Sequence, residues 1–215
     1  MAGDVRFLSH HDFMRLLARA AARASLPLAY TQGFNPHPKL SVPLPRPVGV
    51  AARSELLVLA LAEDADAPAV LALGGQLPPG VRLLRVEALA SGAAPRVRSA
   101  RYELALRPAE LPAARRRLEA LEALQRWEVN RSRKRPGRSG GGVRVLDVKG
   151  RVRALRLDGD VLSFTLAYTP DGSVRCAEML ALLGLTGPIG TEGASARDAS
   201  EAAARLVRTE IQCES

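Results

Sequence analysis

A polar segment at residues 30–41, YTQGFNPHPKLS, carries side chains that could do acid–base chemistry. It holds the Tyr30 phenol, the His37 imidazole and the Lys39 ammonium group within ten residues. The prolines on both sides of His37 fix φ and hold the imidazole in a defined position. In RNA cleavage by the 2′-hydroxyl, His37 could move a proton, Lys39 could stabilise the phosphorane and Tyr30 could share either task. We therefore take these residues as tentative catalytic candidates that need no metal.

The same segment fits two readings without chemistry. With the Gln32 and Asn35 amides, its cation and imidazole make a phosphate or nucleotide cradle. In a purely structural reading, the amides satisfy backbone groups of the loop and His37 caps a neighbour. Binding is the hypothesis that the composition of the segment favours, and all three stay open.

A helix is predicted directly before this segment. Ser9 and Asp12 resemble a capping box, and the following apolar positions recur with helical spacing until Pro27. His10 lies at the helix start, where it could face the same end of the sheet as the loop. His10, Asp12 and His37 match no strong metal-ligand spacing, so we expect no metal. Basic side chains four residues apart form a stripe along the helix: His11, Arg15, Arg19 and Arg23.

The net charge of +9 and the isoelectric point near 10.6 favour a polyanionic partner. The most basic stretch, NRSRKRPGRSGGG, contains no acidic residue. Binding of phosphates there would release counterions and weaken with salt. We expect this hairpin to supply affinity for RNA. The predicted RNA- or phosphate-binding residues are His10, Arg15, Arg19, Gln32, Asn35, Lys39, Arg131, Arg133, Lys134, Arg135 and Arg138.

Several classes of protein are disfavoured. Cys176 and Cys213 stand far apart without CxxC spacing, which argues against a disulfide framework, a zinc knuckle or an iron–sulfur site. There is no signal-peptide pattern and no apolar run fit to span a bilayer. We expect a cytoplasmic protein without a cofactor and without a membrane partner.

The elements that must position these residues follow a β-α-β-β-α-β order over about residues 5–90. Strands are expected at 5–9, 54–63 and 80–90, an edge strand or an irregular ribbon at 40–51, and the second helix at 66–78. The aromatic residues are scattered and read mostly as core, with no aromatic ladder of the kind that stacks RNA bases on a sheet.

The second half repeats this order less cleanly. A strand, a helix and a strand are followed by the basic tip, a hairpin that turns at Asp158–Asp160, and a helix that ends at Gly184. The fold class is therefore α+β, with two ferredoxin-like halves, the second degenerate, and antiparallel sheets covered by helices on one face. The expected domains are 4–90 and 100–185, followed at 186–215 by a linker and a C-terminal helix.

The stretch from RFLSHHD to QGFNPHPKLSVPLPRPVGV resembles the radical-SAM-linked family of bacterial proteins of unknown function. The resemblance extends over about residues 4–185. It implies a role around RNA, beside a radical SAM protein and often near ribonuclease E/G. The chain lacks the CxxxCxxC motif of a radical SAM cluster, so it is not itself the radical enzyme.

We therefore expect an RNA-binding accessory protein in RNA processing or modification, whose partners are a structured RNA such as tRNA or rRNA and a radical SAM protein. One alternative is a metal-independent endoribonuclease that uses Tyr30, His37 and Lys39. The other is a protein–protein adaptor for a radical SAM enzyme.

Overall fold

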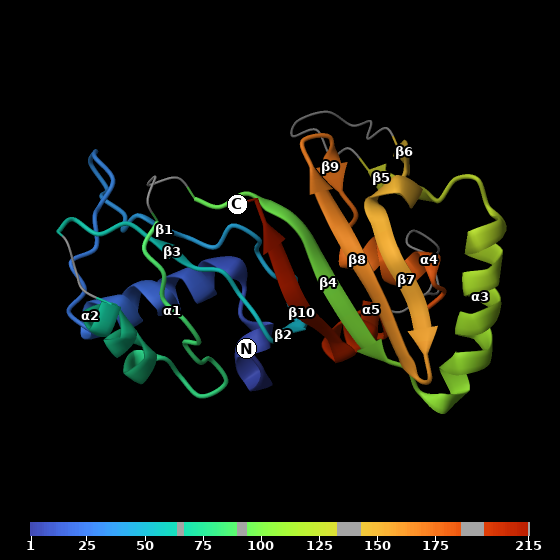
Figure 1. Cartoon of the computed structure of the whole chain (residues 1–215), viewed down its shortest axis with the longest axis horizontal. Coiled ribbons are helices and arrows are strands. Elements are labelled where there is room, and N and C mark those ends of the chain that lie inside the picture. The colour runs from blue at the N-terminus through green and yellow to red at the C-terminus, as the bar shows by residue number, and fades with distance from the viewer. Residues whose placement is uncertain (64–66, 90–93, 133–142, 186–195, 215) are drawn as a thin grey trace. The chain divides into compact units, whose positions relative to one another are not determined.

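The computed structural model of the chain describes residues 1–63, 67–89, 94–132, 143–185 and 196–214. The fold is α+β, as the sequence predicts (Figure 1). The chain divides into two compact units. Unit 1 is Met1–Val97 with Ile211–Ser215, and unit 2 is Arg98–Glu210.

Unit 1 is built around one long helix and very short strands. Its described elements are the 3-10 helix η1 (Gly3–Phe7), α1 (His10–Arg23), β1 (Leu40–Ser41), β2 (Ala51–Ala52), β3 (Val58–Leu59), α2 (Ala67–Leu71) and the 3-10 helix η2 (Ala72–Gln76). β1 and β3 pair antiparallel, with Leu40 opposite Leu59. The rest of the unit is held by backbone bonds between irregular segments.

Helix α1 begins and ends at recognisable caps. The Ser9 hydroxyl accepts a hydrogen bond from the Asp12 N–H at 3.1 Å, which confirms the predicted cap. At the other end, the Leu26 N–H donates to the Ala21 carbonyl and the Ser25 N–H donates to the Ala22 carbonyl. These bonds form a Schellman motif with Ser25 in the left-handed region, so α1 ends before Pro27 is reached.

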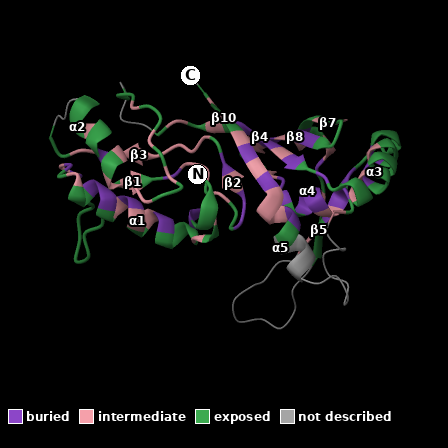
Figure 2. Cartoon of the chain, turned by 90° about the horizontal axis from the view of Figure 1, so that it is seen from below, coloured by how far each residue is buried: buried purple, intermediate pink, exposed green. Residues whose placement is uncertain are grey.

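The apolar face of α1 supplies much of the core of unit 1. One cluster of buried side chains contains Ala20, Ala21, Leu26, Leu28 and Leu73. A second cluster contains Phe13, Leu17 and Val42. Figure 2 shows buried and exposed residues recurring along α1, as expected for an amphipathic helix. The loop that follows α1 is thus tied to the core through Leu26 and Leu28.

Several predicted elements of unit 1 are wrong in detail. Residues 3–7 form η1 instead of a strand, and the carbonyls of Val5 and Arg6 accept hydrogen bonds from the Arg46 side chain instead of a neighbouring strand. Residues 42–50 are irregular, which is the second of the two predicted possibilities for 40–51, because prolines cannot donate to a ladder. Residues 81–89 contain no helix or strand.

Unit 2 is a helix-covered sheet with an inserted hairpin. Its described elements are β4 (Val97–Ala105), the 3-10 helix η3 (Pro108–Glu110), α3 (Leu111–Ala123), β5 (Glu128–Ser132), β6 (Val143–Asp147), the 3-10 helix η4 (Lys149–Arg151), β7 (Val152–Asp158), β8 (Val161–Thr169), β9 (Gly172–Ser173), α4 (Cys176–Leu182), α5 (Ala196–Arg205) and β10 (Leu206–Cys213). Neighbouring strands run in the order β10-β4-β8-β7, and β9 pairs with β8. Figures 1 and 2 place α4 and α5 on the same face of this sheet.

The element order of unit 2 is compatible with the predicted ferredoxin-like pattern. β4, α3, β7, β8, the α4–α5 pair and β10 follow each other as β-α-β-β-α-β, and the β5–β6 hairpin stands between α3 and β7. The predicted turn is confirmed, because Asp158 pairs with Val161 across Gly159 and Asp160. The buried face of the sheet carries Tyr102, Phe164 and Leu166.

The C-terminal prediction is wrong in one respect. A helix was expected over 201–211, but α5 ends at Arg205 and residues 206–213 form β10 beside β4. In the first half of β10 burial follows a two-residue period, with Leu206 and Arg208 buried and Val207 and Thr209 half-buried. A buried arginine hides this alternation from a reading of the sequence, since Arg208 counts there as a surface residue.

Candidate nucleic-acid interface

The loop at residues 30–39 has a firmly bonded base. The Lys39 N–H donates to the Ala29 carbonyl at 2.7 Å, the Ala29 N–H to the Ala60 carbonyl at 2.8 Å, and the Ala60 N–H to the Lys39 carbonyl at 2.9 Å. These bonds close a ring that joins both ends of the loop to the segment after β3. Tyr30 and Pro38 form an antiparallel bridge directly above it.

A second pair of bonds closes the loop nearer its tip. The Thr31 N–H donates to the His37 carbonyl at 2.9 Å, and the His37 N–H donates to the Thr31 hydroxyl at 3.0 Å. Only residues 32–36 remain beyond these bonds. Gly33 lies there at a φ of +132°, a conformation that side-chain-bearing residues rarely adopt. Sequence reasoning missed Thr31, whose bonds are to the backbone of residue 37 and depend on the way the loop closes.

The register of this ribbon separates the three tentative catalytic residues. Residues two apart on one strand share a face, and residues directly opposite each other also share a face. Since Tyr30 is opposite Pro38, and Thr31 is bonded to His37, the imidazole and the Lys39 side chain lie on one face. The Tyr30 phenol lies on the other. The loop therefore pairs His37 with Lys39 and does not bring Tyr30 beside them.

The side chains of the loop tip face solvent. Gln32, Asn35, His37 and Lys39 are all exposed. Tyr30 is 50% exposed and Phe34 is 107% exposed, which means that the Phe34 ring touches almost nothing in the chain. The expectation that the aromatics belong to the core is wrong for both, as it is for Phe7. It is confirmed for the buried rings Phe13, Tyr102, Trp127 and Phe164.

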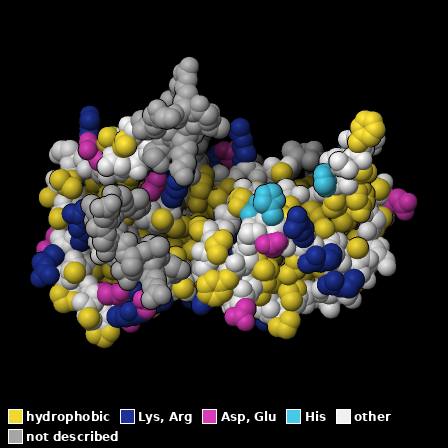
Figure 3. All heavy atoms as spheres, turned by 180° about the vertical axis from the view of Figure 1, so that it is seen from behind, with side chains coloured by type: hydrophobic (Ala, Val, Ile, Leu, Met, Phe, Trp, Pro, Cys, Tyr) yellow, Lys and Arg dark blue, Asp and Glu magenta, His cyan; other side chains and the backbone are white. Residues whose placement is uncertain are grey.

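The exposed face of α1 carries the predicted basic stripe. Arg15, Arg19 and Arg23 are exposed and, at four-residue intervals, spread over about 80° of the helix circumference. Arg15 is 74% exposed and lies 3.7 Å from the Asp12 carboxylate, a surface contact of small energy. Arg23 donates to Gln76 in η2. Figure 3 shows a row of basic side chains beside histidines on the face of unit 1 over α1.

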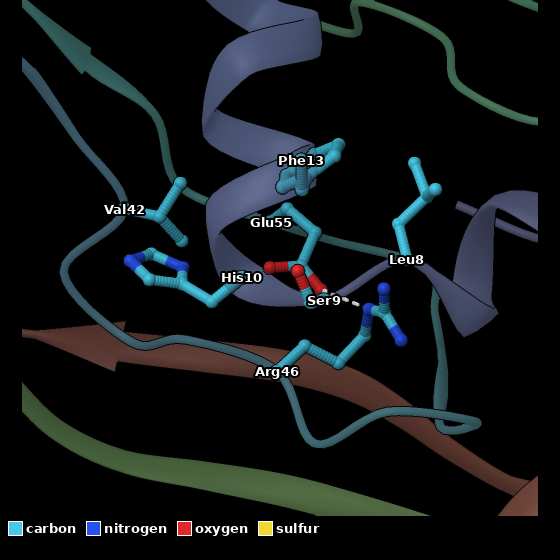
Figure 4. Close-up of a pocket in the computed structure, with 7 residues that line it drawn as sticks. All are labelled: Leu8, Ser9, His10, Phe13, Val42, Arg46 and Glu55. Atoms are coloured by element: carbon cyan, nitrogen blue, oxygen red, sulfur yellow. Dashed lines mark ion pairs between the residues drawn. The ribbon is translucent and has the colours of Figure 1, made fainter.

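A hollow lies at the start of α1, where His10 was predicted to act. It is lined by Leu8, Ser9, His10, Phe13, Val42, Arg46 and Glu55. Figure 4 shows the Glu55 carboxylate pointing toward the Arg46 guanidinium, with Ser9 and His10 beside it. The ion-pair distance is 3.7 Å, and both side chains are largely buried, at 16% and 5% exposure.

The Arg46 side chain connects two backbone segments beside this hollow. Its Nη1 donates to the carbonyls of Arg6 at 2.7 Å and Val50 at 2.5 Å, so one guanidinium ties η1 to the turn before β2. Sequence reasoning missed Arg46 and Glu55. The sequence signal for Arg46 was a single arginine between two prolines in an otherwise apolar stretch. His10 remains exposed at the rim, open to a ligand and not committed to the core.

The predicted basic hairpin is described only at its base. Arg131 of β5 makes a two-pronged ion pair with Glu178 of α4, at 2.6 and 2.7 Å. Burial raises the pKa of Glu178, but hydrogen bonds from Arg131 and from the Arg175 N–H outweigh it and hold this pKa below its ordinary value. Arg131 thus anchors the hairpin, and its contact with RNA stays a prediction. The other predicted cations of the hairpin lie outside the described residues: Arg133, Lys134, Arg135 and Arg138.

The described residues also bear on metal binding and on membrane insertion. No group of three or more histidine, cysteine, aspartate or glutamate side chains in these segments could hold a metal ion. Across the same segments, no helix has the length and apolar character to cross a bilayer.

Comparison with known proteins gives one match. Residues 2–176 match the family described as "Uncharacterized protein conserved in bacteria (DUF2344)". Neither a curated protein nor a solved structure matches the chain.

Proposed function

The chain belongs to the DUF2344 family of uncharacterized proteins conserved in bacteria, and we propose that it binds RNA as an accessory protein in RNA processing or modification. The observation that carries this proposal is the surface of unit 1. Exposed arginines on α1 and an exposed loop with aromatic, amide and cationic side chains belong to the same compact unit. Cations that follow a backbone, together with aromatic rings that can stack on bases, are what RNA binding requires.

The charges exposed on α1 support the binding of a polyanion by this surface. Arg15 and Arg19 are exposed, and the only acidic side chain on α1 is Asp12. Phosphate contacts by these arginines would release counterions from RNA, which is the main source of sequence-independent affinity. The +9 net charge of the chain adds long-range attraction for a polyanion.

The geometry favours binding over cleavage. A general acid, a general base and a charge stabiliser must all reach one phosphodiester. His37 and Lys39 share a face of the ribbon, but Tyr30 does not. The exposed setting of His37 also excludes little water, so it suits a contact residue better than a catalytic one.

We further propose that this RNA role is carried out in the cytoplasm together with a radical SAM protein. The support is the resemblance of the RFLSHHD and QGFNPHPKLS motifs to the radical-SAM-linked family. In this arrangement the chain holds the RNA and the partner supplies the radical chemistry. The competing hypothesis is an adaptor that contacts only the partner protein, and the test below distinguishes the two.

The proposal is tested by anisotropy titration of a labelled structured RNA with the full chain over a range of salt concentrations. The double variant Arg15→Ala/Arg19→Ala should bind more weakly. Its log–log salt slope should fall by roughly 1.4 to 1.8, since each lost phosphate contact removes about 0.7 to 0.9. The matched control is Arg115→Ala/Arg116→Ala on α3, which removes two equally exposed helical arginines and should leave the slope unchanged.

Three other outcomes would contradict the proposal. Equal loss in both double variants would mean that only net charge matters. Absence of binding at low salt, with a radical SAM protein co-purifying, would select the adaptor. Shortening of the RNA without added metal, abolished by His37→Ala, would select the endoribonuclease.

A further inference from the structure

The Phe34 ring is the most exposed large apolar side chain described in the chain. Its exposure of 107% means that the ring is held off the surface by the loop that carries it. Scattered apolar side chains on a protein surface are usual. An aromatic ring at the tip of a loop whose base is closed by backbone hydrogen bonds is a more specific arrangement.

The shape of the tip depends on its neighbours. Gly33, directly before Phe34, lies at a φ of +132°, and a Cβ built there would meet nothing within 4 Å. The glycine is therefore required by the backbone turn and not by crowding. Gln32 and Asn35, two positions before and one position after Phe34 in the sequence, both have exposed side chains. Each amide offers both donors and an acceptor, the groups that read the edge of a nucleobase.

We propose that Phe34 stacks on an unpaired base, so that unit 1 recognises single-stranded or bulged nucleotides in a structured RNA. This inference rests on the proposed RNA-binding function. Bases inside an A-form duplex are stacked on each other and sit behind a deep, narrow groove, so the ring has no face to meet there. An unpaired base presents its face to the ring and its edge to Gln32 or Asn35.

The surroundings of the ring favour a base over a pocket in a protein partner. An aromatic anchor in a protein interface is normally ringed by further contacts that exclude water. Within the described loop, the residues next to Phe34 are a glycine and two amides, with His37 and Lys39 behind them. Stacking between Phe34 and a base needs no such surrounding contacts, and the Lys39 ammonium group suits a phosphate beside the base.

The test compares two labelled RNAs of equal length, one fully paired and one with a single-nucleotide bulge, each titrated with the full chain. Phe34→Ala should weaken binding to the bulged RNA by roughly 5- to 150-fold, the range expected when one stacked base is lost. Binding to the paired RNA should change by less than about 2-fold. Phe34→Trp should restore binding to the bulged RNA, because the larger ring also stacks. The matched control is Phe7→Ala, which removes another exposed ring of unit 1 outside the loop.

The outcomes separate this inference from the proposed function. If both RNAs bind with salt-dependent affinity and Phe34→Ala affects neither or both equally, stacking is overturned and RNA binding stands. If the wild-type chain binds neither RNA, both proposals fail. If Phe34→Ala leaves RNA affinity intact but abolishes capture of a protein partner, the ring is a protein anchor and the inference is wrong. Since the ring touches almost nothing, Phe34→Ala should leave the melting temperature unchanged, which excludes misfolding as an explanation.

Discussion

Arginine side chains in this chain do two physically different jobs. On α1, Arg15 is 74% exposed, and its contact with Asp12 is screened by water. Arg46 and Arg131 are largely buried and are bonded to several oxygen atoms, so they hold backbone segments and a carboxylate in place. The net charge of the chain includes the exposed and the buried arginines equally. The surface available to a polyanion is therefore smaller than the composition indicates.

The Arg131–Glu178 pair gives a prediction about stability. Glu178 is buried, and Arg131→Ala would leave its carboxylate without its main partner. We expect the free energy of unfolding at pH 7 to fall by about 3 kcal/mol, measured by urea denaturation. Arg144→Ala, which removes the exposed arginine directly opposite Arg131 in the hairpin, should change it by less than about 0.5 kcal/mol.

The pH dependence of this effect follows from the lowered pKa of Glu178. A carboxyl group whose pKa is lower in the folded state contributes stability above its unfolded value, here 4.5, and loses it as the pH falls through the folded pKa. The difference between wild type and Arg131→Ala should therefore shrink when both are denatured at pH 3. A difference that is absent at pH 7, or that grows in acid, would contradict this account of the pair.

Sequence reasoning singles out residues that lie close together in the chain and overlooks partners that only the fold brings together. The loop 30–41 and the α1 stripe were identified because their chemistry is contiguous or repeats every four residues. Arg131 and Glu178 are 47 residues apart, so no local pattern links them. Arg46 and Glu55 lie much closer in the sequence, and they were missed because only the fold shows that both are desolvated.

At the scale of elements, two helices end in the same motif with different residues. α1 ends with Ser25 at a φ of +54°, and α4 ends with Gly184 at a φ of +69°. In both, the next residue's N–H reaches back to the carbonyl five positions before it, from Leu26 to Ala21 and from Leu185 to Leu180. A serine has a Cβ that crowds this left-handed conformation, whereas a glycine does not.

Exchanging serine and glycine between these two C-terminal caps tests whether the left-handed position carries strain. Ser25→Gly should raise the free energy of unfolding by about 0.5–1 kcal/mol, because the strain at this position is removed. Gly184→Ser should lower it by about 1 kcal/mol through backbone strain, since a Cβ there meets no atom of the described residues within 4 Å. Both are measured by thermal and urea unfolding. Destabilisation by Ser25→Gly would show that the Schellman geometry at α1 is not under strain.

Periodicity predicted the long elements well and the short ones poorly. α1, α3 and the β7–β8 hairpin carry enough repeats for a 3.6- or 2-residue period to emerge. The strands β1, β2 and β3 are two residues long, too short for any period, and are formed by pairing across the fold. β10 was read as a helix continuation because the alanines before it favour helix and Arg208 conceals the alternation.

At the scale of the whole molecule, the chain combines two compact units, and both expose arginine side chains. Unit 1 carries all of the histidines, the exposed arginines of α1 and the aromatic loop tip. In unit 2, Arg131 and Arg205 form ion pairs with largely buried side chains and stabilise the fold. The sequence predicts two halves, at 4–90 and 100–185, from the order of elements. What distinguishes unit 1 is the exposed aromatic loop tip beside the histidines, since exposed arginines occur on both units.

The most direct test of the account is ultraviolet crosslinking of the full chain to a structured RNA, with the crosslinked residues mapped by mass spectrometry. We expect crosslinked nucleotides on residues of the loop 30–39, above all on Phe34 and Tyr30. These crosslinks should be lost when Arg15→Ala/Arg19→Ala weakens binding. Crosslinks confined to unit 2, or none at all under conditions where the RNA is saturated with protein, would contradict the claim that unit 1 is an RNA-binding surface.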